Sequence, residues 1–391
     1  MPIIWTRRIL SLLLPRRVKP APYVLLVCAL LTACSTPTGI KFTSGPLIGQ
    51  DIETVLVATT RAPNGRADYS GDRDGTLHLM SYGISIPPIH KIGQIEWPKG
   101  APDPKRHFAV ASADPFATPA AFQASLGQMA DAAKGTGKGA RRSAALFVHG
   151  YNTDFSESLY RAAQLRHDFG LKMPLTLFSW PSAGEPGLYI YDRDSVKTSR
   201  DQLASLIRLM VKAPVDDVTL IAHSLGSELL METLRQLALE NRGSLPSKIR
   251  SVILISPDLD IDVFNAQLNV IKTLPPEFAI FASQKDKALQ LSSFLAGDRN
   301  RVGNNIDETK ILRAGITVFD VSDFTGGDGM NHMTAVTSPS LVALLKGMTT
   351  TNQRVFLQAP GEKTTFSDVV VDTATLPLTL VVKTTSAILQ Q

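Results

Sequence analysis

Residues 218–226 read VTLIAHSLG and join a short apolar run to a helical one. Val218 to Ala222 has the β-branched content of a buried strand, and Leu225 to Leu239 has the apolar spacing of an amphipathic helix. A serine at a sharp strand-to-helix turn projects its hydroxyl from the sheet edge, and small neighbours let strand and helix approach. Ser224 is therefore a candidate nucleophile. In the five-residue motif Ala222 to Gly226, Ala222 stands where glycine is usual, so the motif alone is a weak signal. The strand before it and the helix after it make the assignment strong.

Strand-like and helical runs alternate on both sides of this stretch. We expect strands at 55–59, 77–86, 108–111, 144–148, 175–180, 218–222, 252–255, 278–281 and 316–321, and helices at 117–133, 156–169, 195–212 and 225–239. Short, continuous apolar strands between amphipathic helices are typical of a parallel sheet that is covered on both faces. The sequence therefore predicts a doubly wound α/β domain.

The composition is that of a folded protein with a basic beginning. The chain has 391 residues, 44% of them apolar and 19% charged, which excludes a disordered, collagen-like or coiled-coil protein. Its formal net charge of +5 would suit a nucleic-acid or anionic-membrane partner. The first 19 residues, however, hold five positive charges, and no acidic residue occurs before Cys34. Without residues 1–33 the net charge is zero, so we expect no nucleic-acid partner.

The basic segment and the apolar run from Tyr23 to Leu31 together are typical of a secretion signal. The run is shorter than the ~20 residues that a membrane-spanning helix needs. It ends in Leu31-Thr32-Ala33-Cys34, which resembles the lipobox of bacterial lipoproteins. We therefore expect cleavage after Ala33, acylation of Cys34 and anchoring to the outer membrane, facing the periplasm. An ordinary secretion signal followed by a chance cysteine is the alternative.

The expected organisation has four parts. Residues 1–33 form the signal, 34–50 a flexible tether rich in Thr, Pro, Gly and Ser, 51–348 the α/β domain, and 349–391 a Thr-rich extension. Strand-like residues at 369–371 and 378–382 suggest that the extension adds a strand pair or is only partly ordered. Cys28 and Cys34 are the only cysteines, so the mature domain has no thiol for a disulfide or a metal.

A second motif follows the strand that is expected at 144–148. It reads His149-Gly150-Tyr151-Asn152 and occupies the place where serine hydrolases of this architecture carry a loop that binds the oxyanion. We expect the backbone N–H groups of Tyr151 and Leu225 to form this hole. The side chain of His149 is expected to be structural, buried and hydrogen-bonded to the backbone.

Chain order restricts the rest of a catalytic triad. In serine hydrolases built on such a sheet the nucleophile precedes the acid, and the acid precedes the histidine. His332 is the only histidine after Ser224, and it lies in a turn-rich loop beyond the strand at 316–321. Asp286, just past the strand at 278–281, is the favoured acid. Asp258 and Asp260 follow the preceding strand and are the alternatives, or they cap a helix or order a loop.

The run from about Asp51 to Leu345 resembles a bacterial family of α/β-hydrolases of unknown function that are similar to esterases and lipases. The resemblance implies an α/β-hydrolase fold with Ser224 as nucleophile, Asp286 as acid and His332 as base, and it implies no particular substrate. The motifs that carry it are Ala58-Thr59-Thr60-Arg61, Val148-His149-Gly150-Tyr151-Asn152, Phe178-Ser179-Trp180-Pro181-Ser182-Ala183-Gly184, Asp192-Arg193-Asp194-Ser195, Ala222-His223-Ser224-Leu225-Gly226-Ser227 and Ser256-Pro257-Asp258.

Aromatic residues follow the strand at 175–180. Trp180, Tyr189 and Tyr191 are expected in a loop at the open edge of the sheet, where they line a substrate pocket or pack around its rim. The scattered His and Asp residues lack metal-ligand spacings such as His-x-x-x-His, and no Gly-rich phosphate loop follows the first strand, so no metal or cofactor is expected.

Two functional hypotheses remain. The first is a hydrolase of carboxylic esters, with a substrate that could be lipid-like, held at the cell envelope through Cys34. The second is a non-catalytic envelope lipoprotein that uses the hydrolase scaffold as an interaction module. The presence of a serine, an acid and a histidine in the expected order favours the enzyme.

Overall fold

A computed structural model describes residues 39–43, 47, 49–136, 140–296, 301–304, 310–311, 313–324, 329–342 and 381–384. The expected signal, Cys34, most of the tether and the strand-like residues 369–371 lie outside these ranges. Within them, no helix has both the length and the apolar content that a bilayer crossing requires.

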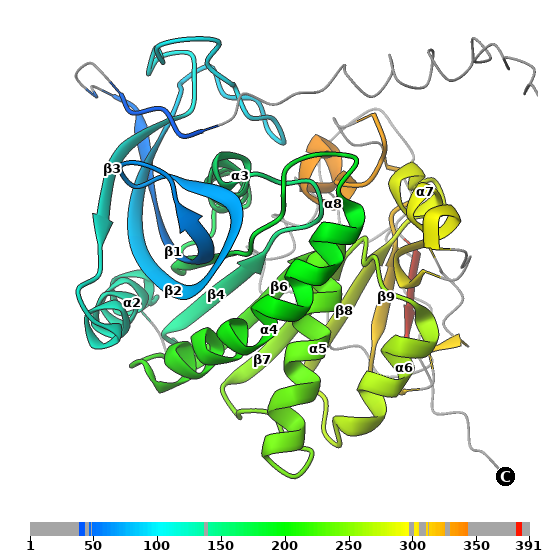
Figure 1. Ribbon diagram of the computed structural model, residues 1–391. Helices are drawn as coiled ribbons and strands as arrows, with labels where there is room; N and C mark the ends of the chain where they lie inside the picture. Colours follow the sequence, from blue (N-terminus) through cyan, green and yellow to red (C-terminus); the bar gives the residue numbers. More distant parts are fainter. Residues whose placement is uncertain are drawn as a thin grey trace, which may run out of the picture. The chain divides into compact units, whose positions relative to one another are not determined.

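The framework is one ten-stranded sheet with the order β10-β9-β8-β7-β6-β4-β5-β1-β2-β3 (Figure 1). Every neighbouring pair from β9 across to β1 is parallel, whereas β2, β3 and β10 join antiparallel at the two edges. The α/β-hydrolase prediction for the fold is confirmed. The strands are β1 (Asp51–Pro63), β2 (Tyr69–Ile86), β3 (Ala109–Pro115), β4 (Ser143–Val148), β5 (Leu175–Ser179), β6 (Asp217–His223), β7 (Ile249–Ile255), β8 (Glu277–Ala282), β9 (Thr317–Asp320) and β10 (Val381–Thr384).

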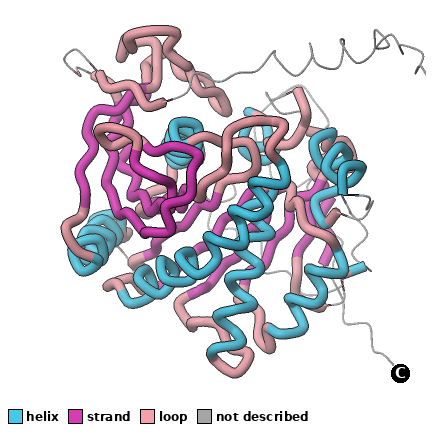
Figure 2. The backbone as a smooth tube through the Cα atoms, in the orientation of Figure 1, coloured by secondary structure: helices cyan, strands magenta, loops and turns pink. Residues whose placement is uncertain are grey.

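Helices cover both faces of this sheet. In the view of Figure 2, α4 and α5 cross in front of the strands, and α3 lies behind them. The helices are α2 (Pro119–Ala133), α3 (Phe155–Asp168), α4 (Tyr189–Lys212), α5 (Leu225–Glu240), α6 (Ile261–Val270), α7 (Lys287–Ala296) and α8 (Thr334–Thr337), with a 3₁₀ turn, η1, at Val302–Asn304.

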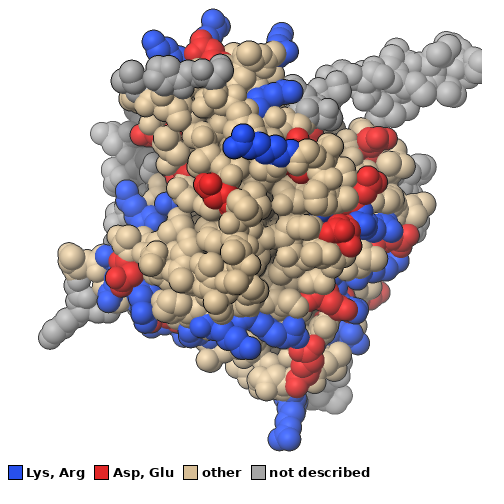
Figure 3. Space-filling model, turned by 60° about the vertical axis from the view of Figure 1, so that its left-hand side comes forward, with Lys and Arg blue, Asp and Glu red and all other residues tan. Residues whose placement is uncertain are grey.

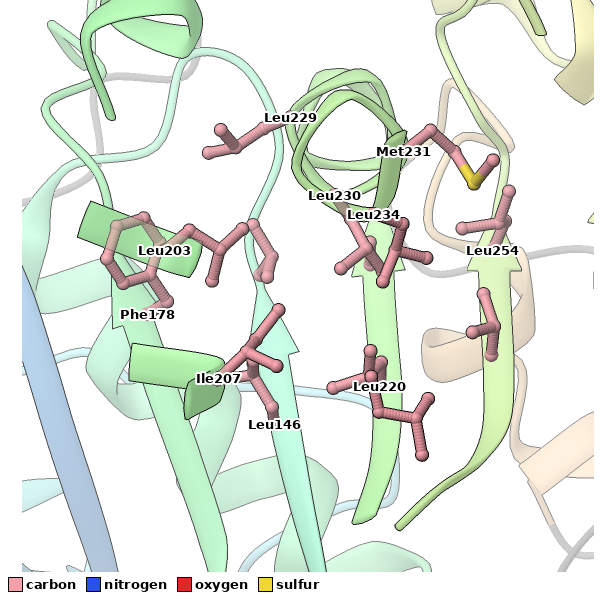
Figure 4. Packing of buried hydrophobic residues seen from close by; sticks show 14 of the residues in the cluster. Leu146, Phe178, Leu203, Ile207, Leu220, Leu229, Leu230, Met231, Leu234 and Leu254 are labelled. Atoms are coloured by element: carbon pink, nitrogen blue, oxygen red, sulfur yellow. The ribbon is translucent and has the colours of Figure 1, made fainter. Parts of the chain in front are cut away.

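Strand alternation divides the core between the two faces. In β4, Leu146 and Val148 join the cluster packed against α2, α4, α5 and α6, whereas Ala145 and Phe147 join the cluster packed against α3 and α8. Figure 4 shows Leu146 and Leu220 pointing from their strands toward the helical layer. Because successive residues of a strand face opposite sides, a strand that is covered on both faces must be apolar throughout. This is why the buried strands read as continuous apolar runs.

Two elements differ from the sequence-based expectations. The hairpin of β1 and β2 is longer than predicted, because its exposed polar residues keep pairing as far as Pro63 and Tyr69, with irregular register around Arg61. Helix α4 begins at Tyr189 and not at Ser195, so Tyr189 and Tyr191 lie in a helix rather than a loop. Of the expected tail strands, 378–382 overlaps β10 at residues 381 and 382, and β10 pairs with β9; residues 378–380 lie outside the described ranges.

Charged side chains are mixed in sign at the surface. On the face shown in Figure 3, acidic and basic residues surround a broad uncharged area. Several of the exposed charges are paired, for example Arg142 with Asp216 at 2.8 Å and Lys197 with Asp194 at 2.9 Å. Exposed pairs contribute only about 0–1 kcal/mol each, so the apolar core rather than surface charge holds the fold together.

Candidate active site

Ser224 occupies the sharp turn between β6 and α5. Its backbone has φ 52° and ψ −128°, a region that non-glycine residues rarely adopt and that costs about 1–3 kcal/mol. The turn is held at both ends, because the Ser224 N–H donates to Ile255 O (2.9 Å) and the Ser224 carbonyl accepts from Ser227 N–H (2.9 Å) and Asp258 N–H (3.2 Å). The sequence-predicted nucleophile therefore sits on a strained turn that the sheet itself fixes.

The glycine that ends the pentapeptide is required by a close approach. A Cβ atom on Gly226 would lie 2.2 Å from the carbonyl oxygen of His149, which is shorter than any tolerable contact. Helix α5 therefore packs directly on the end of β4. The same contact brings the loop after β4 beside the nucleophile turn.

The expected oxyanion residues lie on either side of Ser224. Gly150 packs so closely on the turn that a Cβ there would be 2.8 Å from Ser224 Cβ, and Tyr151 follows it directly. Leu225 is the first residue of α5, so its N–H has no carbonyl acceptor within the helix. The structure places both residues where the hole was expected, and their role in it stays a prediction.

Asp192 fixes the loop that carries Tyr151. This fully buried carboxylate of α4 accepts hydrogen bonds from Asn152 N–H (3.1 Å), Ala183 N–H (2.8 Å) and Ser182 Oγ (2.5 Å). Burial raises the pKa of Asp192, and these three donors and the charge of Arg61 act in the opposite direction. One side chain thus ties the loop after β4 to the loop after β5.

Arg61 binds the same two loops, those after β4 and β5, from the protein interior. Its guanidinium is fully buried and donates to the carbonyl oxygens of Ser182 (2.8 Å) and Thr153 (2.7 Å) and to Ser179 Oγ (2.9 Å). Burial lowers the pKa of Arg61 to about 10, still well above neutrality. Sequence reasoning assigned no role to Arg61, although an arginine that follows the buried strand residues 55–60 signals a satisfied internal charge.

His149 is a structural residue, as expected, and Trp180 is one too. The His149 ring nitrogens lie 2.9 Å from Gly150 O and 3.1 Å from Trp180 O. Trp180 stacks on this imidazole at 4.9 Å and donates from Nε1 to His149 O (2.8 Å). The pocket hypothesis does not hold for Trp180, because its side chain is 0% exposed and supports the loop from the interior.

Asp286 and His332 lie in contact at the carboxyl edge of the sheet. Asp286 follows β8, and its Oδ2 is 2.8 Å from Nδ1 of His332. Its other oxygen, Oδ1, accepts from Leu289 N–H (3.0 Å) in the first turn of α7, so the fully buried carboxylate cannot rotate freely. With Nδ1–H donating to Asp286, the neutral ring keeps its lone pair on Nε2, the atom that a general base requires.

His223, which sequence reasoning passed over, positions the His332 loop. Its Nε2–H donates to the carbonyl oxygen of His332 (3.2 Å), and the two rings lie 4.7 Å apart. Burial and the neighbouring His332 charge lower the pKa of His223 well below its usual value, so the ring is neutral. Because His223 directly precedes Ser224, this bond holds the histidine loop next to the nucleophile.

The alternative acids have other partners. Asp258 accepts from Ser292 Oγ (2.6 Å) and from the Tyr189 hydroxyl (2.8 Å), and it lies 3.4 Å from the buried Arg301. Asp260 caps α6 by accepting from the N–H groups of its first turn. The structure thus places Asp286 in contact with the His332 ring, while Asp258 and Asp260 have these other partners. The Tyr189 ring lies 5.2 Å from that of Tyr151. Its role at the substrate pocket stays a prediction.

A parallel sheet with a serine on a strained strand-to-helix turn, followed in chain order by an acid and a histidine, defines an α/β-hydrolase. The chain belongs to the family described as "Alpha/beta hydrolase of unknown function (DUF900)", whose model matches residues 128–349, more than half of the chain. The matched range includes Ser224, Asp286 and His332. A search of curated protein sequences gave no match.

The similarity to solved structures is low. A predicted CIB-like hydrolase from Thermoplasma acidophilum is 13% identical, with 77% of this chain and 99% of that chain covered and a TM-score of 0.31. An esterase from Pyrobaculum calidifontis is 12% identical, with 53% and 76% covered and a TM-score of 0.31. A fungal esterase structure from Rhizomucor miehei is 14% identical, with 76% and 83% covered and a TM-score of 0.32. At these scores the function must be argued from the site itself.

The buried His149 predicts a loss of stability in acid. Burial, reinforced by the Arg61 charge, lowers its folded-state pKa to about 3, against about 6.5 in the unfolded chain. A lowered pKa stabilises the fold above the unfolded value, and this contribution is lost as the pH falls from about 6.5 toward 3. We expect His149→Asn to lose less unfolding free energy than the wild type between pH 7.5 and pH 4.5, measured by urea denaturation.

His107→Asn serves as the control and should keep the wild-type slope of unfolding free energy against pH. Equal slopes for wild type and His149→Asn would contradict the assignment.

Proposed function

We propose that this α/β-hydrolase cleaves carboxylic esters through a Ser224–His332–Asp286 triad. The observation that carries the proposal is the Asp286–His332 hydrogen bond of 2.8 Å, formed on the loop that His223 holds beside the strained Ser224 turn. An acid that orients a histidine next to a serine at the carboxyl ends of the strands is the constellation that activates a hydroxyl for acyl transfer.

The reaction would proceed in two steps. His332 Nε2 takes the Ser224 proton as Ser224 Oγ attacks the ester carbonyl, and the backbone N–H groups of Tyr151 and Leu225 bind the oxyanion. The alcohol leaves with the proton from His332, and water then cleaves the acyl-enzyme by the same route. Each oxyanion donor would contribute roughly 2.7–4 kcal/mol to the transition state. Asp286 would keep the imidazole in the tautomer that this sequence of transfers needs.

The test is labelling of the full chain with a fluorophosphonate probe, followed by a screen of p-nitrophenyl esters. The wild type should label, Ser224→Ala should not, and His332→Ala and Asp286→Asn should react at least about 10³-fold more slowly. His107→Ala, a histidine outside the site, is the matched control. A folded wild type that does not label, with circular dichroism showing an intact fold, would favour the interaction module over the enzyme. Labelling without ester turnover would keep the activated serine and exclude these esters as substrates.

We also propose that the enzyme acts at the cell envelope, anchored through acylated Cys34. The lipobox-like segment before Cys34 supports this, and an anchored esterase would meet lipid-like esters at the membrane surface. Cells expressing the chain should incorporate labelled palmitate into the wild type and not into Cys34→Ser. Cys28→Ser is the control, because Cys28 lies before the expected cleavage point. Incorporation that survives in Cys34→Ser would refute the anchor.

Asp192 offers a test of how the oxyanion loop is positioned. Asparagine in its place keeps the shape and removes one of the two carboxylate acceptors, so the segment around Tyr151 should shift. Because a displacement of about 1 Å can cost ~10²-fold in rate, we expect kcat for an ester to fall about 10- to 100-fold with a smaller change in KM. Asp194→Asn, at an exposed position on the same helix, should match the wild type. An unchanged kcat in folded Asp192→Asn would show that the loop does not depend on this carboxylate.

A further inference from the structure

A second group of ionisable side chains lies at the amino ends of the parallel strands, whereas Ser224 lies at their carboxyl ends. His90 follows β2 in the loop after Ile86, and His167 and Asp168 end α3. One nitrogen or oxygen atom from each of these three residues lies within 4.8 Å of the other two. Because β1 starts at this edge and the nucleophile turn follows the far end of β6, the group takes no part in the proposed triad.

Asp168 is held so that one oxygen faces His90. Its side chain is 1% exposed, and Oδ2 accepts from Gly93 N–H (2.7 Å) and from Gln164 Nε2 (2.6 Å). Oδ1 lies 2.8 Å from Nε2 of His90. The carboxylate is therefore already oriented, with its Oδ1 directed into the group.

A glutamate lies beside Nδ1 of each imidazole. Glu96 Oε2 is 2.8 Å from Nδ1 of His90, and Glu53 Oε1 is 3.5 Å from Nδ1 of His167. The other Glu53 oxygen accepts from Arg166 Nε at 2.6 Å, which steadies that carboxylate. A histidine that binds a metal almost always directs its second nitrogen to a carboxylate or carbonyl in this way. Nε2 of His90 then faces Asp168, and Nε2 of His167 is the ring nitrogen opposite the one that Glu53 contacts.

A cavity gives access to these atoms. It has a volume of ≈ 340 Å³ and is lined by His90, His167 and Asp168 together with Asp51 and apolar residues of the same loop. The space admits water or a further ligand, which a metal site with three protein ligands requires. The carboxyl end of α3, where His167 and Asp168 lie, also carries the negative end of the helix dipole, which favours a cation.

We propose that His90, His167 and Asp168 bind a divalent transition metal ion such as Zn²⁺. Two imidazole nitrogens and a carboxylate oxygen are donors that such ions accept, at about 2.0–2.2 Å. Two ligands of a tetrahedral ion at that distance stand about 3.3–3.4 Å apart, so His90 Nε2 and Asp168 Oδ1, now 2.8 Å apart, need to separate by ~0.5 Å. The His167 atom lies within 4.8 Å of both and needs to settle at the same spacing. The ion replaces the proton that these two atoms share, and that proton passes to solvent.

The ion would act as a clamp. It joins the connection between β2 and β3 to the end of α3, two segments already linked by the hydrogen bonds of Asp168. The two residues that bind Asp168 Oδ2 also reach α8, because Gln164 Nε2 donates to Val336 O (3.3 Å) and a Cβ on Gly93 would lie 2.2 Å from Thr337 O. Helix α8 directly follows the loop of His332. Metal binding would therefore stabilise the segment that carries the proposed base.

The experiment measures Zn²⁺ binding to the full, EDTA-treated and dialysed chain by isothermal titration calorimetry, with the absorption spectrum of the Co²⁺-loaded chain as a second readout. We expect one ion per chain, and binding at least 100-fold weaker in His167→Gln. His167→Gln removes one ligand and leaves the contacts of His90 with Glu96 and Asp168, so its fold should survive where a His90 variant fails. His78→Gln, whose histidine pairs with Asp74 outside the group, should bind like the wild type.

Three outcomes would overturn the proposal. They are no saturable binding by the folded wild type, equal binding by wild type and His167→Gln, and loss of binding in His78→Gln alone. Each would leave the group as an internal ion cluster, in which His90 bridges Glu96 and Asp168 without a metal. Because the readouts are binding and a Co²⁺ spectrum, they stand apart from ester cleavage, and either proposal can fail without the other.

Discussion

The backbone strain at Ser224 is the constraint on which the rest of the site depends. A residue with φ 52° persists only where its surroundings leave no easier conformation, and here β7 binds its N–H while Asp258 and Ser227 bind its carbonyl. The turn also needs Gly226, because α5 must approach the end of β4. The position of the hydroxyl is thus set by strand pairing and helix packing, the most rigid parts of the molecule, and the loops that carry the other groups are arranged around it.

Those loops are held by polar groups buried beneath them. Arg61 and Asp192 are both fully buried, and between them they bind the loops after β4 and β5 at several points. A buried charge without partners is expensive, so each of these residues keeps its loop in the one arrangement that satisfies it. His223 does the same for the third loop through the carbonyl of His332. Loop geometry here follows from internal hydrogen bonding.

The sequence predicted the elements better than the contacts. The parallel strands and the turn at Ser224 were predictable because each apolar run and the strand-to-helix junction carry a local signal. Chain order singled out His332, and a place after the strand at 278–281 favoured Asp286 over Asp258 and Asp260, whereas the hydrogen bond of His223 depends on tertiary packing. Trp180 looked like a pocket residue because its type suits both a pocket and a core, and only burial distinguishes them. The start of α4 at Tyr189 could not be predicted, because its N-cap residue, Leu188, makes no side-chain capping hydrogen bond. His90 and Asp168 lie 78 positions apart, so no spacing rule could join them.

The short strand β10 changes what counts as the complete domain. Val381–Thr384 pairs antiparallel with all of β9, Thr317–Asp320, at what would otherwise be the open border of the sheet. An uncovered edge strand has unpaired N–H and C=O groups that can pair with a strand of another molecule, and such strands are a common origin of aggregation. A fragment cut at residue 348, the end of the domain as the sequence suggested it, would expose that border. Residues 381–384 thus complete the border of the sheet although they lie beyond the expected domain end.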